Sequence, residues 1–302
     1  MDSILHALCA NGRVRAAAIS ARDMVTQAQA LHGLSRVATA ALGRQLMMTA
    51  MMASQLKNDG DRVSTIIRGD GPAGSMVCTG APGPVVKGYV ANPETELPPT
   101  SEGKLDVGGY VGHTGRLTVV RDLPVGEPYV GVCNLVSGEI AVDFAQYFTV
   151  SEQQPSLVYL GVRMDAGTGH VRAAAGVLLQ PLPDCPDEVI DALQARADEI
   201  TTLARRLDGG EDLEMAFQAL LGGIDVSITE RFTPVLRCDC TRERIERALL
   251  SVGADELRDM IEQDGGAEVK CHFCHAAYRF SAAELTELLR QAQAEEHGQD
   301  AT

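Results

Sequence analysis

Four cysteines in the last third of the chain form two close pairs. One residue separates Cys238 from Cys240, two separate Cys271 from Cys274, and 30 residues (241–270) lie between the pairs. Structural zinc sites use four cysteine or histidine ligands, commonly as two pairs that the intervening chain brings together. The spacing therefore predicts one Zn²⁺ per chain, bound by all four cysteines. The alternative interpretation is four free buried thiols, which would rarely cluster in this way.

The first pair is tighter than usual, since paired cysteines of structural zinc sites typically have two to four residues between them. A tighter loop leaves fewer backbone N–H groups to shield the sulfurs, and thiolates are the form of cysteine that oxidants attack. Cysteines so close in sequence can also form a disulfide with little movement. A static structural zinc site and a redox switch both remain open on spacing alone.

Two histidines near the cysteine pairs, and four further cysteines elsewhere in the chain, give weaker indications of metal or redox chemistry. His272 and His275 flank the second pair and could replace a cysteine ligand, but four cysteines already complete a tetrahedral site. No open position for a catalytic water is indicated, which argues against hydrolytic zinc chemistry. The remaining cysteines are scattered, and we expect them to be small buried hydrophobic residues, with Cys185 the candidate for extra redox chemistry: Cys9, Cys78, Cys133 and Cys185.

Composition narrows the class of protein. Apolar residues make up 45 % of 302 residues, and the formal net charge is −15. Binding to nucleic acid or to an anionic membrane surface requires clustered Lys and Arg, so both are disfavoured as partners. The start of the chain has no basic leader with a long apolar stretch, and residues 173–179 are too short to span a membrane. We expect a soluble, cytoplasmic protein.

Residues 1–180 predict an α+β domain. We expect mainly helix over residues 1–60, after a short extended segment at 14–19, with the best helix at about 35–57. Residues 62–180 alternate short Val/Ile/Thr/Tyr runs with Gly and Pro, which predicts strands at 63–67, 85–90, 117–120, 130–132 and 157–162. A helix at about 140–150 interrupts them. Methionines 47, 48, 51 and 52 are expected in the core.

One glycine-rich motif lies at residues 69–74. Gly69, Gly71 and Gly74 match the G-x-G-x-x-G pattern of dinucleotide-binding sites, but the following residues predict a strand where such a site needs a helix. We therefore interpret this segment as a β-turn.

Residues 181–231 are predicted to be an acidic, helical linker. Proline and acidic residues mark the start of a helix over about 187–207, and a second helix is expected at about 211–221. We expect this linker, helical to about residue 230, to dock on the β-rich domain through one apolar stripe. The stripe is our candidate linker switch: Val189, Leu193, Ile200, Leu203 and Leu207.

Residues 232–302 are predicted to form a small zinc-binding domain. One helical run covers about 242–262, between the cysteine pairs, and a short strand is expected at 268–270. Ser281 and Glu284 match a capping box at the start of the last helix.

The cysteine pattern and several other motifs resemble a known family, the redox-regulated heat-shock holdases called 33-kilodalton chaperonins. The resemblance covers nearly the whole chain. Its most specific motifs are the two cysteine segments, 238–244 and 271–274 with Tyr278 and Phe280 after them. The supporting motifs are Glu262-Gln263-Asp264-Gly265-Gly266, Gly69-Asp70-Gly71-Pro72, Tyr147-Phe148, Ser151-Glu152-Gln153-Gln154-Pro155 and Ala175-Gly176-Val177-Leu178-Leu179-Gln180.

The resemblance implies a chaperone that is inactive when reduced and zinc-bound. It implies that oxidants release zinc and form the disulfides Cys238–Cys240 and Cys271–Cys274. The zinc domain and the linker would then unfold, the protein would tend to dimerise, and exposed surfaces would hold unfolding client proteins without ATP.

The sequence disfavours two other classes of protein. A zinc-ribbon nucleic-acid-binding module is disfavoured because residues 236–302 contain eight Lys/Arg against fourteen Asp/Glu. An enzyme is disfavoured because the sequence contains no recognisable acid/base or nucleophile constellation.

Overall fold

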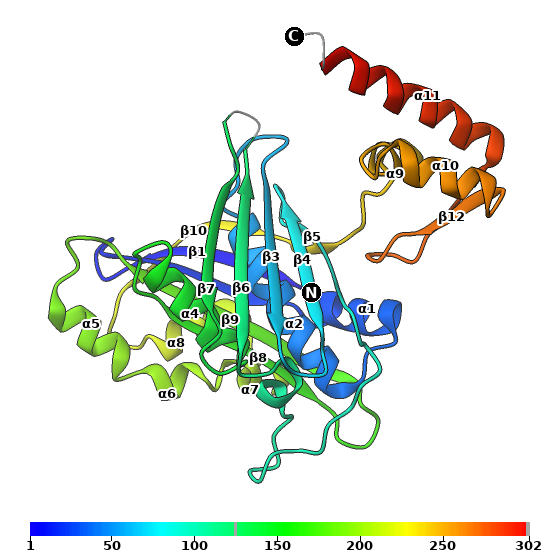
Figure 1. Ribbon diagram of the computed structural model, residues 1–302. Helices are drawn as coiled ribbons and strands as arrows, with labels where there is room; N and C mark the ends of the chain where they lie inside the picture. The colour runs from blue at the N-terminus through cyan, green and yellow to red at the C-terminus, as the bar shows by residue number, and fades with distance from the viewer. Residues whose placement is uncertain (124–125, 300–302) are drawn as a thin grey trace. The chain divides into compact units, whose positions relative to one another are not determined.

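The computed structural model describes residues 1–123 and 126–299, with side chains described to residue 293. It divides into two compact units, Met1–Arg237 and a second that begins at Cys238 (Figure 1). Both units combine helices and sheets, so the α+β class is confirmed. The finer division at residues 180 and 231 stays a prediction.

A five-stranded antiparallel sheet forms one half of the first unit. Its strand order is β10-β1-β2-β9-β8. Both of its faces are covered: Ala17 and Ile19 pack into one apolar cluster, whereas Ala16 and Ala18 pack into another. Because both faces are buried, the sequences of β2 and β9 are nearly continuous apolar runs. The strands are β1 (Ser3–Cys9), β2 (Val14–Ser20), β8 (Leu157–Met164), β9 (Val171–Pro181) and β10 (Val226–Phe232).

A six-stranded sheet forms the other half, in the order β11-β5-β4-β3-β6-β7. Burial alternates strictly along β4 and β5, so one face of this sheet is in the core and the other is more open. The strands predicted in this region are all present, and the glycine motif leads from β3 into β4 without a helix, as predicted. The strands are β3 (Arg62–Gly69), β4 (Ser75–Ala81), β5 (Val85–Val90), β6 (Gly115–Asp122), β7 (Tyr129–Asn134) and β11 (Val235–Leu236).

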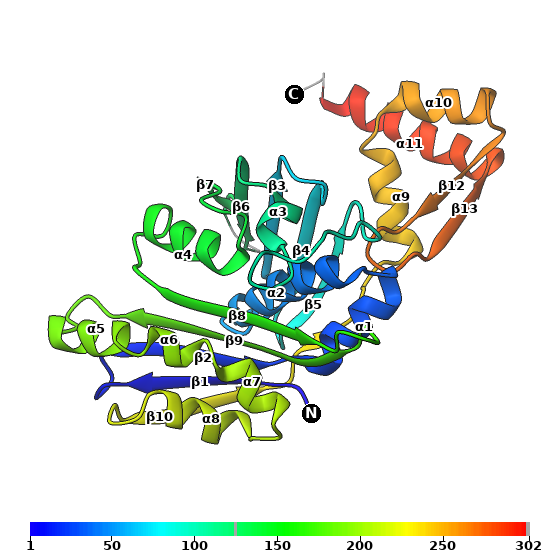
Figure 2. The same cartoon turned by 90° about the horizontal axis from the view of Figure 1, so that it is seen from below.

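Helix α2 (Arg36–Ala53) lies between the two sheets and contacts strands of both (Figures 1 and 2). Ser35 caps it by accepting a hydrogen bond from the Ala38 N–H at 3.1 Å. The four methionines of this helix are at most 1 % exposed, which confirms that they belong to the core. The other helices of this part are α1 (Arg22–His32), α3 (Val107–Val111) and α4 (Ile140–Val150), and the prediction of mainly helix in residues 1–60 missed β1.

Four short helices cover the second face of the five-stranded sheet: α5 (Asp187–Gln194), α6 (Ala197–Ile200), α7 (Leu203–Asp208) and α8 (Leu213–Leu220) (Figure 2). The predicted single helix over 187–207 is therefore wrong. Thr201 and Thr202 donate hydroxyl hydrogen bonds to the Asp198 and Glu199 carbonyls, at 2.6 and 2.7 Å. Such side-chain bonds compete with the helical ladder and break it into turns.

The end of the predicted linker also differs from expectation. Residues 226–232 are strand β10, which pairs with β1, and not helix. Val226 and Ile228 alternate with exposed residues along this strand and pack against the second apolar cluster, so a pattern of period two decides its structure.

The second unit contains α9 (Arg242–Leu250), α10 (Ala254–Glu262), a hairpin of β12 (Gly266–Lys270) and β13 (Ala277–Ser281), and α11 (Ala282–Gln299). The predicted helix over 242–262 is two helices: the first ends at Leu250, and Gly253, whose φ of 102° favours glycine, lies just before the second. The capping box is confirmed, since the Ser281 N–H donates to the Glu284 carboxylate at 2.8 Å. Across the described part of the chain, no helix is long and apolar enough to cross a membrane.

Candidate metal centre

The β12–β13 hairpin positions the second cysteine pair. Cys271 follows β12 directly, and its N–H donates to the Ala276 carbonyl at 2.9 Å. The His275 N–H donates back to the Cys271 carbonyl at 2.8 Å, and His275 adopts the left-handed φ of 61° that the tight turn requires. These bonds close a compact loop that holds Cys271 and Cys274 at the end of a rigid hairpin.

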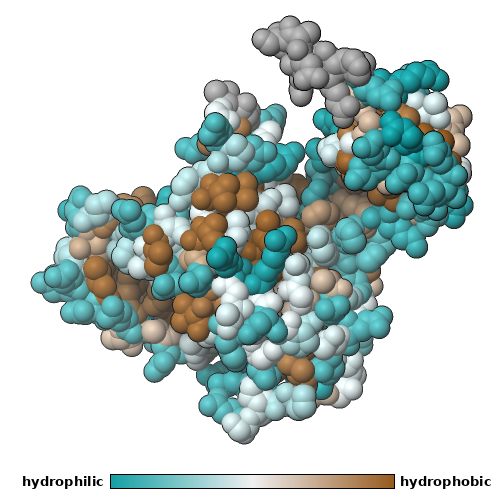
Figure 3. Space-filling view, in the orientation of Figure 1, coloured by the Kyte–Doolittle hydropathy of each residue, from teal (hydrophilic) through white to brown (hydrophobic). Residues whose placement is uncertain are grey.

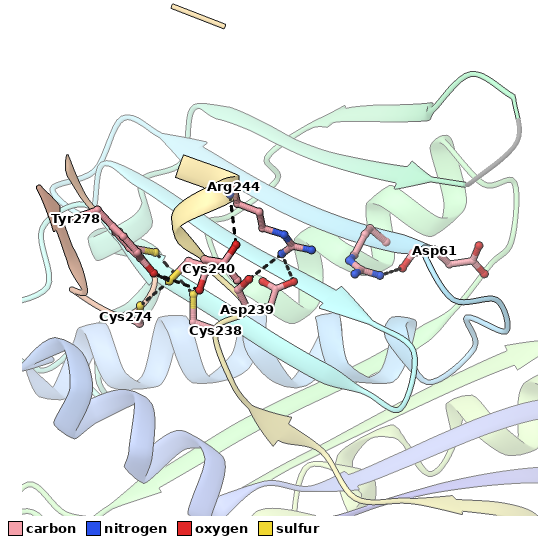
Figure 4. Close-up of polar contacts among 10 residues, drawn as sticks. Asp61, Cys238, Asp239, Cys240, Arg244, Cys274 and Tyr278 are labelled. Atoms are coloured by element: carbon pink, nitrogen blue, oxygen red, sulfur yellow. Dashed lines mark hydrogen bonds and ion pairs between the residues drawn. The ribbon is translucent and has the colours of Figure 1, made fainter. Parts of the chain in front are cut away.

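The start of α9 positions the first pair. Thr241 caps this helix by accepting from the Arg244 N–H at 3.3 Å, so Cys240 lies just before the helix N-terminus. The partial positive charge at that end stabilises a thiolate. Arg244 forms an ion pair with the Asp239 carboxylate and donates to the Asp239 carbonyl at 3.1 Å, which fixes the residue between the two cysteines (Figure 4).

The four sulfur atoms converge. All four Sγ atoms lie within 4.8 Å of one another. Two contacts join cysteines of different pairs: Cys238 to Cys271 at 3.7 Å and Cys240 to Cys274 at 3.3 Å. A tetrahedral zinc ion with Zn–S bonds of about 2.3 Å requires sulfurs about 3.8 Å apart. The donor set and its spacing therefore fit zinc.

The thiols of the cluster differ in acidity. Burial and the neighbouring sulfurs raise the pKa of Cys238, and burial raises the pKa of Cys274. Burial also acts to raise the pKa of Cys240, but hydrogen bonds from Tyr278 and the other sulfurs outweigh it and lower that pKa to about 7. Cys240 is therefore predisposed to be the thiolate of the cluster.

The sequence identified Tyr278 only as part of the family motif and assigned it no role at this site. The Tyr278 hydroxyl lies 3.2 Å from the Cys240 Sγ and 3.2 Å from the Cys240 carbonyl oxygen (Figure 4). The available signal was its place on β13, four residues after Cys274, but no spacing rule links that position to the other cysteine pair. His272 and His275 are not in the converging ligand group, which consists of the four cysteines.

The scattered cysteines lie apart from this centre. Cys9, Cys78 and Cys133 are buried, and burial raises the pKa of each thiol, so they are unreactive hydrophobic side chains as predicted. Cys185 is partly exposed, unlike the other three, and desolvation raises the pKa of its thiol.

The structure also places the candidate linker switch. Leu193, Ile200 and Leu203 are at most 3 % exposed, and Val189 and Leu207 pack against the same cluster. The Asp208 carboxylate, next to this stripe, pairs with Arg163 on β8 at 3.1 Å and Arg172 on β9 at 2.9 Å. Apolar packing and one doubly paired carboxylate thus fix the segment to the sheet. Its role as a switch stays a prediction.

Four converging thiols on a small unit form a group that could hold a metal ion, carried by a protein of mixed α+β fold. Comparisons with known proteins specify the class. The family model described as Hsp33 protein matches residues 2–281. The 33 kDa chaperonin of Clostridium perfringens (strain SM101 / Type A) is 40 % identical over 291 residues, which cover 96 % of this chain and 92 % of that protein. The 33 kDa chaperonin of Gloeothece citriformis is 41 % identical over 297 residues, covering 97 % and 99 %.

A solved structure agrees with these relatives. The crystal structure of the 33 kDa chaperonin of Thermotoga maritima matches with a TM-score of 0.80 and 34 % identity, over 95 % of this chain and 97 % of that one. The chain therefore belongs to the Hsp33 family and is a chaperone.

Proposed function

We propose that this chaperone is a redox-regulated, ATP-independent holdase. Cys238, Cys240, Cys271 and Cys274 bind one Zn²⁺ in the reduced, inactive protein. The observation that carries the proposal is the convergence of four sulfurs in a unit whose apolar cluster has only six buried residues among those described. A unit with so small a core needs an additional constraint to stay folded.

When bound, zinc holds the four sulfurs as thiolates and ties the start of α9 to the β12–β13 hairpin. Oxidation removes these ligands, because a disulfide sulfur carries no charge. Each pair of thiolates gives two electrons to one peroxide, which takes up two protons and leaves as two water molecules. Two peroxides therefore convert the four thiolates into the two proposed disulfides, Cys238–Cys240 and Cys271–Cys274.

The positions of the four sulfur atoms make the disulfide pairing a direct test of the proposal. In the folded unit the sulfurs of Cys240 and Cys274 lie 3.3 Å apart and those of Cys238 and Cys271 lie 3.7 Å apart, so links across the pairs are also within reach. We expect the disulfides within each pair to form as the unit loosens on zinc release. Sequence proximity favours the local disulfides once it does, since short loops close most readily.

Loss of the folded zinc unit is proposed to release the linker helices from the five-stranded sheet. Undocking would uncover the apolar face that they share with β1, β2 and β9. The first unit also carries exposed apolar side chains, including Tyr129, Val130 and Val132 on β7 and Val142 on α4. Figure 3 shows apolar patches on the face that Figure 1 turns to the viewer. Surfaces of this kind bind other proteins.

The partners are therefore unfolded or partly unfolded client proteins in the cytoplasm, and oxidation is proposed to favour a homodimer. The net charge of −15 argues against nucleic acid and anionic membranes as partners. No catalytic role is proposed, in keeping with a chaperone family.

A light-scattering assay of a heat-unfolding client tests the proposal. The peroxide-treated protein should suppress scattering without ATP, whereas the reduced, zinc-loaded protein should not. Peptide mapping of the same samples should find the two local disulfides. Equal suppression by both forms would refute redox control, and exclusive Cys238–Cys271 and Cys240–Cys274 links would refute the pairing.

A further inference from the structure

A single side chain outside the ligand set connects the two halves of the sulfur cluster. Tyr278 lies on β13, opposite Val269 of β12, in the hairpin that carries Cys271 and Cys274. Its hydroxyl nevertheless reaches Cys240 of the other pair, at 3.2 Å from both the Sγ and the carbonyl oxygen. The tyrosine thus bridges the hairpin and the start of α9.

The hydroxyl has one hydrogen and two possible acceptors at equal distance. A thiolate attracts that hydrogen more strongly than a neutral carbonyl does, because charge-assisted hydrogen bonds are about twice as strong as neutral ones. A disulfide sulfur is only a weak acceptor, so the carbonyl becomes the better partner after oxidation. The hydroxyl can therefore change acceptor with the state of Cys240 while the ring stays in place.

We propose that Tyr278 is a positioning residue of the zinc site, whose hydroxyl donates to the Cys240 thiolate and slows oxidative release of the metal. The proposal rests on the proposed zinc switch. A hydrogen bond to a metal-bound thiolate withdraws electron density from the sulfur, and this makes the sulfur a poorer nucleophile toward peroxide. The same bond keeps the first pair aligned with the hairpin. Outer-shell partners of this kind typically change metal affinity about 10–100-fold when they are removed.

The test uses the full-length protein and the substitution Tyr278→Phe, which removes the hydroxyl and keeps the ring. With peroxide in excess, zinc release measured by a metal-sensitive dye should be severalfold faster than in the parent. In the cobalt-substituted protein, the sulfur-to-cobalt charge-transfer band should move to lower energy, because the sulfur lone pairs lose a stabilising hydrogen bond.

Two variants control for other effects. Arg242→Lys perturbs a second bridge to β13, since Arg242 donates to the Arg279 carbonyl at 3.1 Å and lies 4.3 Å from the Phe280 ring centroid, but its contacts do not involve sulfur. Tyr129→Phe makes the same chemical change in the first unit, where the hydroxyl donates to the Ser151 carbonyl. Neither variant should shift the cobalt band, and Tyr129→Phe should release zinc at the parental rate.

An unchanged charge-transfer band and an unchanged release rate in Tyr278→Phe would overturn the proposal. Equal acceleration in Tyr278→Phe and Arg242→Lys without a band shift would also overturn it, because general loosening would then explain the effect. These readouts do not depend on client binding. If the band and the rate change as expected but no form suppresses aggregation, the holdase proposal fails while the role of Tyr278 stands.

Discussion

The two units of this chain bury very different amounts of apolar surface. The largest cluster of the first unit contains 43 buried residues, with a helix enclosed between two sheets. The cluster of the second unit contains six among the described residues: Leu249, Leu257, Phe280, Leu285, Leu288 and Ala292. Hydrophobic burial is the main favourable term in folding, so we expect the first unit to be stable unaided and the second to depend on its sulfur cluster.

A similar contrast exists within the first unit, between the two faces of the five-stranded sheet. One face packs in the 43-residue cluster with the 18-residue helix α2, whereas the other packs in a cluster of 18 buried residues with helices of four to eight residues. Isolated helices this short are unstable in water. The covering of the second face therefore depends on its side-chain contacts with the sheet. The stability of the molecule is expected to decrease from the α2 layer, through α5–α8, to the metal-dependent unit.

The largest effect should come from removing one sulfur ligand. Cys271→Ser should abolish stoichiometric zinc binding and unfold the second unit, because structural zinc contributes roughly 10–16 kcal/mol in small zinc domains. Metal analysis and NMR spectra of the full chain would measure both losses. Cys185→Ser is the matched control and should change neither. If the second unit of Cys271→Ser stays folded, the claim that this unit depends on its sulfur cluster is wrong.

A smaller effect is expected where the linker helices dock. Leu193→Asp places a charge at a side chain that is 3 % exposed, which should cost about 3–5 kcal/mol of docking free energy. Hydrogen exchange should then show residues 187–220 opening, and the variant should hold clients without oxidant. Met215→Asp, at a position 60 % exposed on α8, is the control and should stay closed. If Leu193→Asp opens the segment without any holdase activity, the linker is not the gate.

The smallest effect concerns the ion pairs that hold α7. Asp208→Asn removes the charge that Arg163 and Arg172 share, and should weaken docking by about 1–3 kcal/mol. Partial burial acts to raise the pKa of Asp208, but the two arginines outweigh it and lower that pKa. Its contribution is therefore complete above the ordinary carboxyl pKa and is lost as the pH falls through the lowered value. Asp184→Asn disrupts the exposed pair with Arg13 and should cost less than about 1 kcal/mol. If hydrogen exchange of α7 depends on pH equally in the parent and in Asp208→Asn, Asp208 does not stabilise the docking of this helix.

Much of this architecture could be predicted from sequence because local patterns decide it. Short Val/Ile/Thr/Tyr runs between Gly and Pro located the strands of the six-stranded sheet, and Ser281 with Glu284 located the start of α11. Helix breaks were harder to predict, because Thr201 and Thr202 favour back-bonding only where tertiary packing permits it. Strand β10 was missed because its partner, β1, lies more than 200 residues away in the sequence.

The candidate site shows the same limit. Ligand type and spacing selected the four cysteines that the structure brings together. The sulfur contacts across the pairs, and the contact of Tyr278 with Cys240, depend on how the hairpin meets the start of α9. That arrangement is a tertiary property, which the spacing of residues along the chain does not encode.

Hydrogen exchange of the full chain, read by mass spectrometry before and after peroxide, tests most directly whether the sulfur cluster holds the second unit together. The account predicts that residues 238–292 lose nearly all protection as zinc is released, that residues 187–220 follow, and that α2 and the six-stranded sheet stay protected. Retained protection of residues 238–292 after complete zinc loss would contradict it.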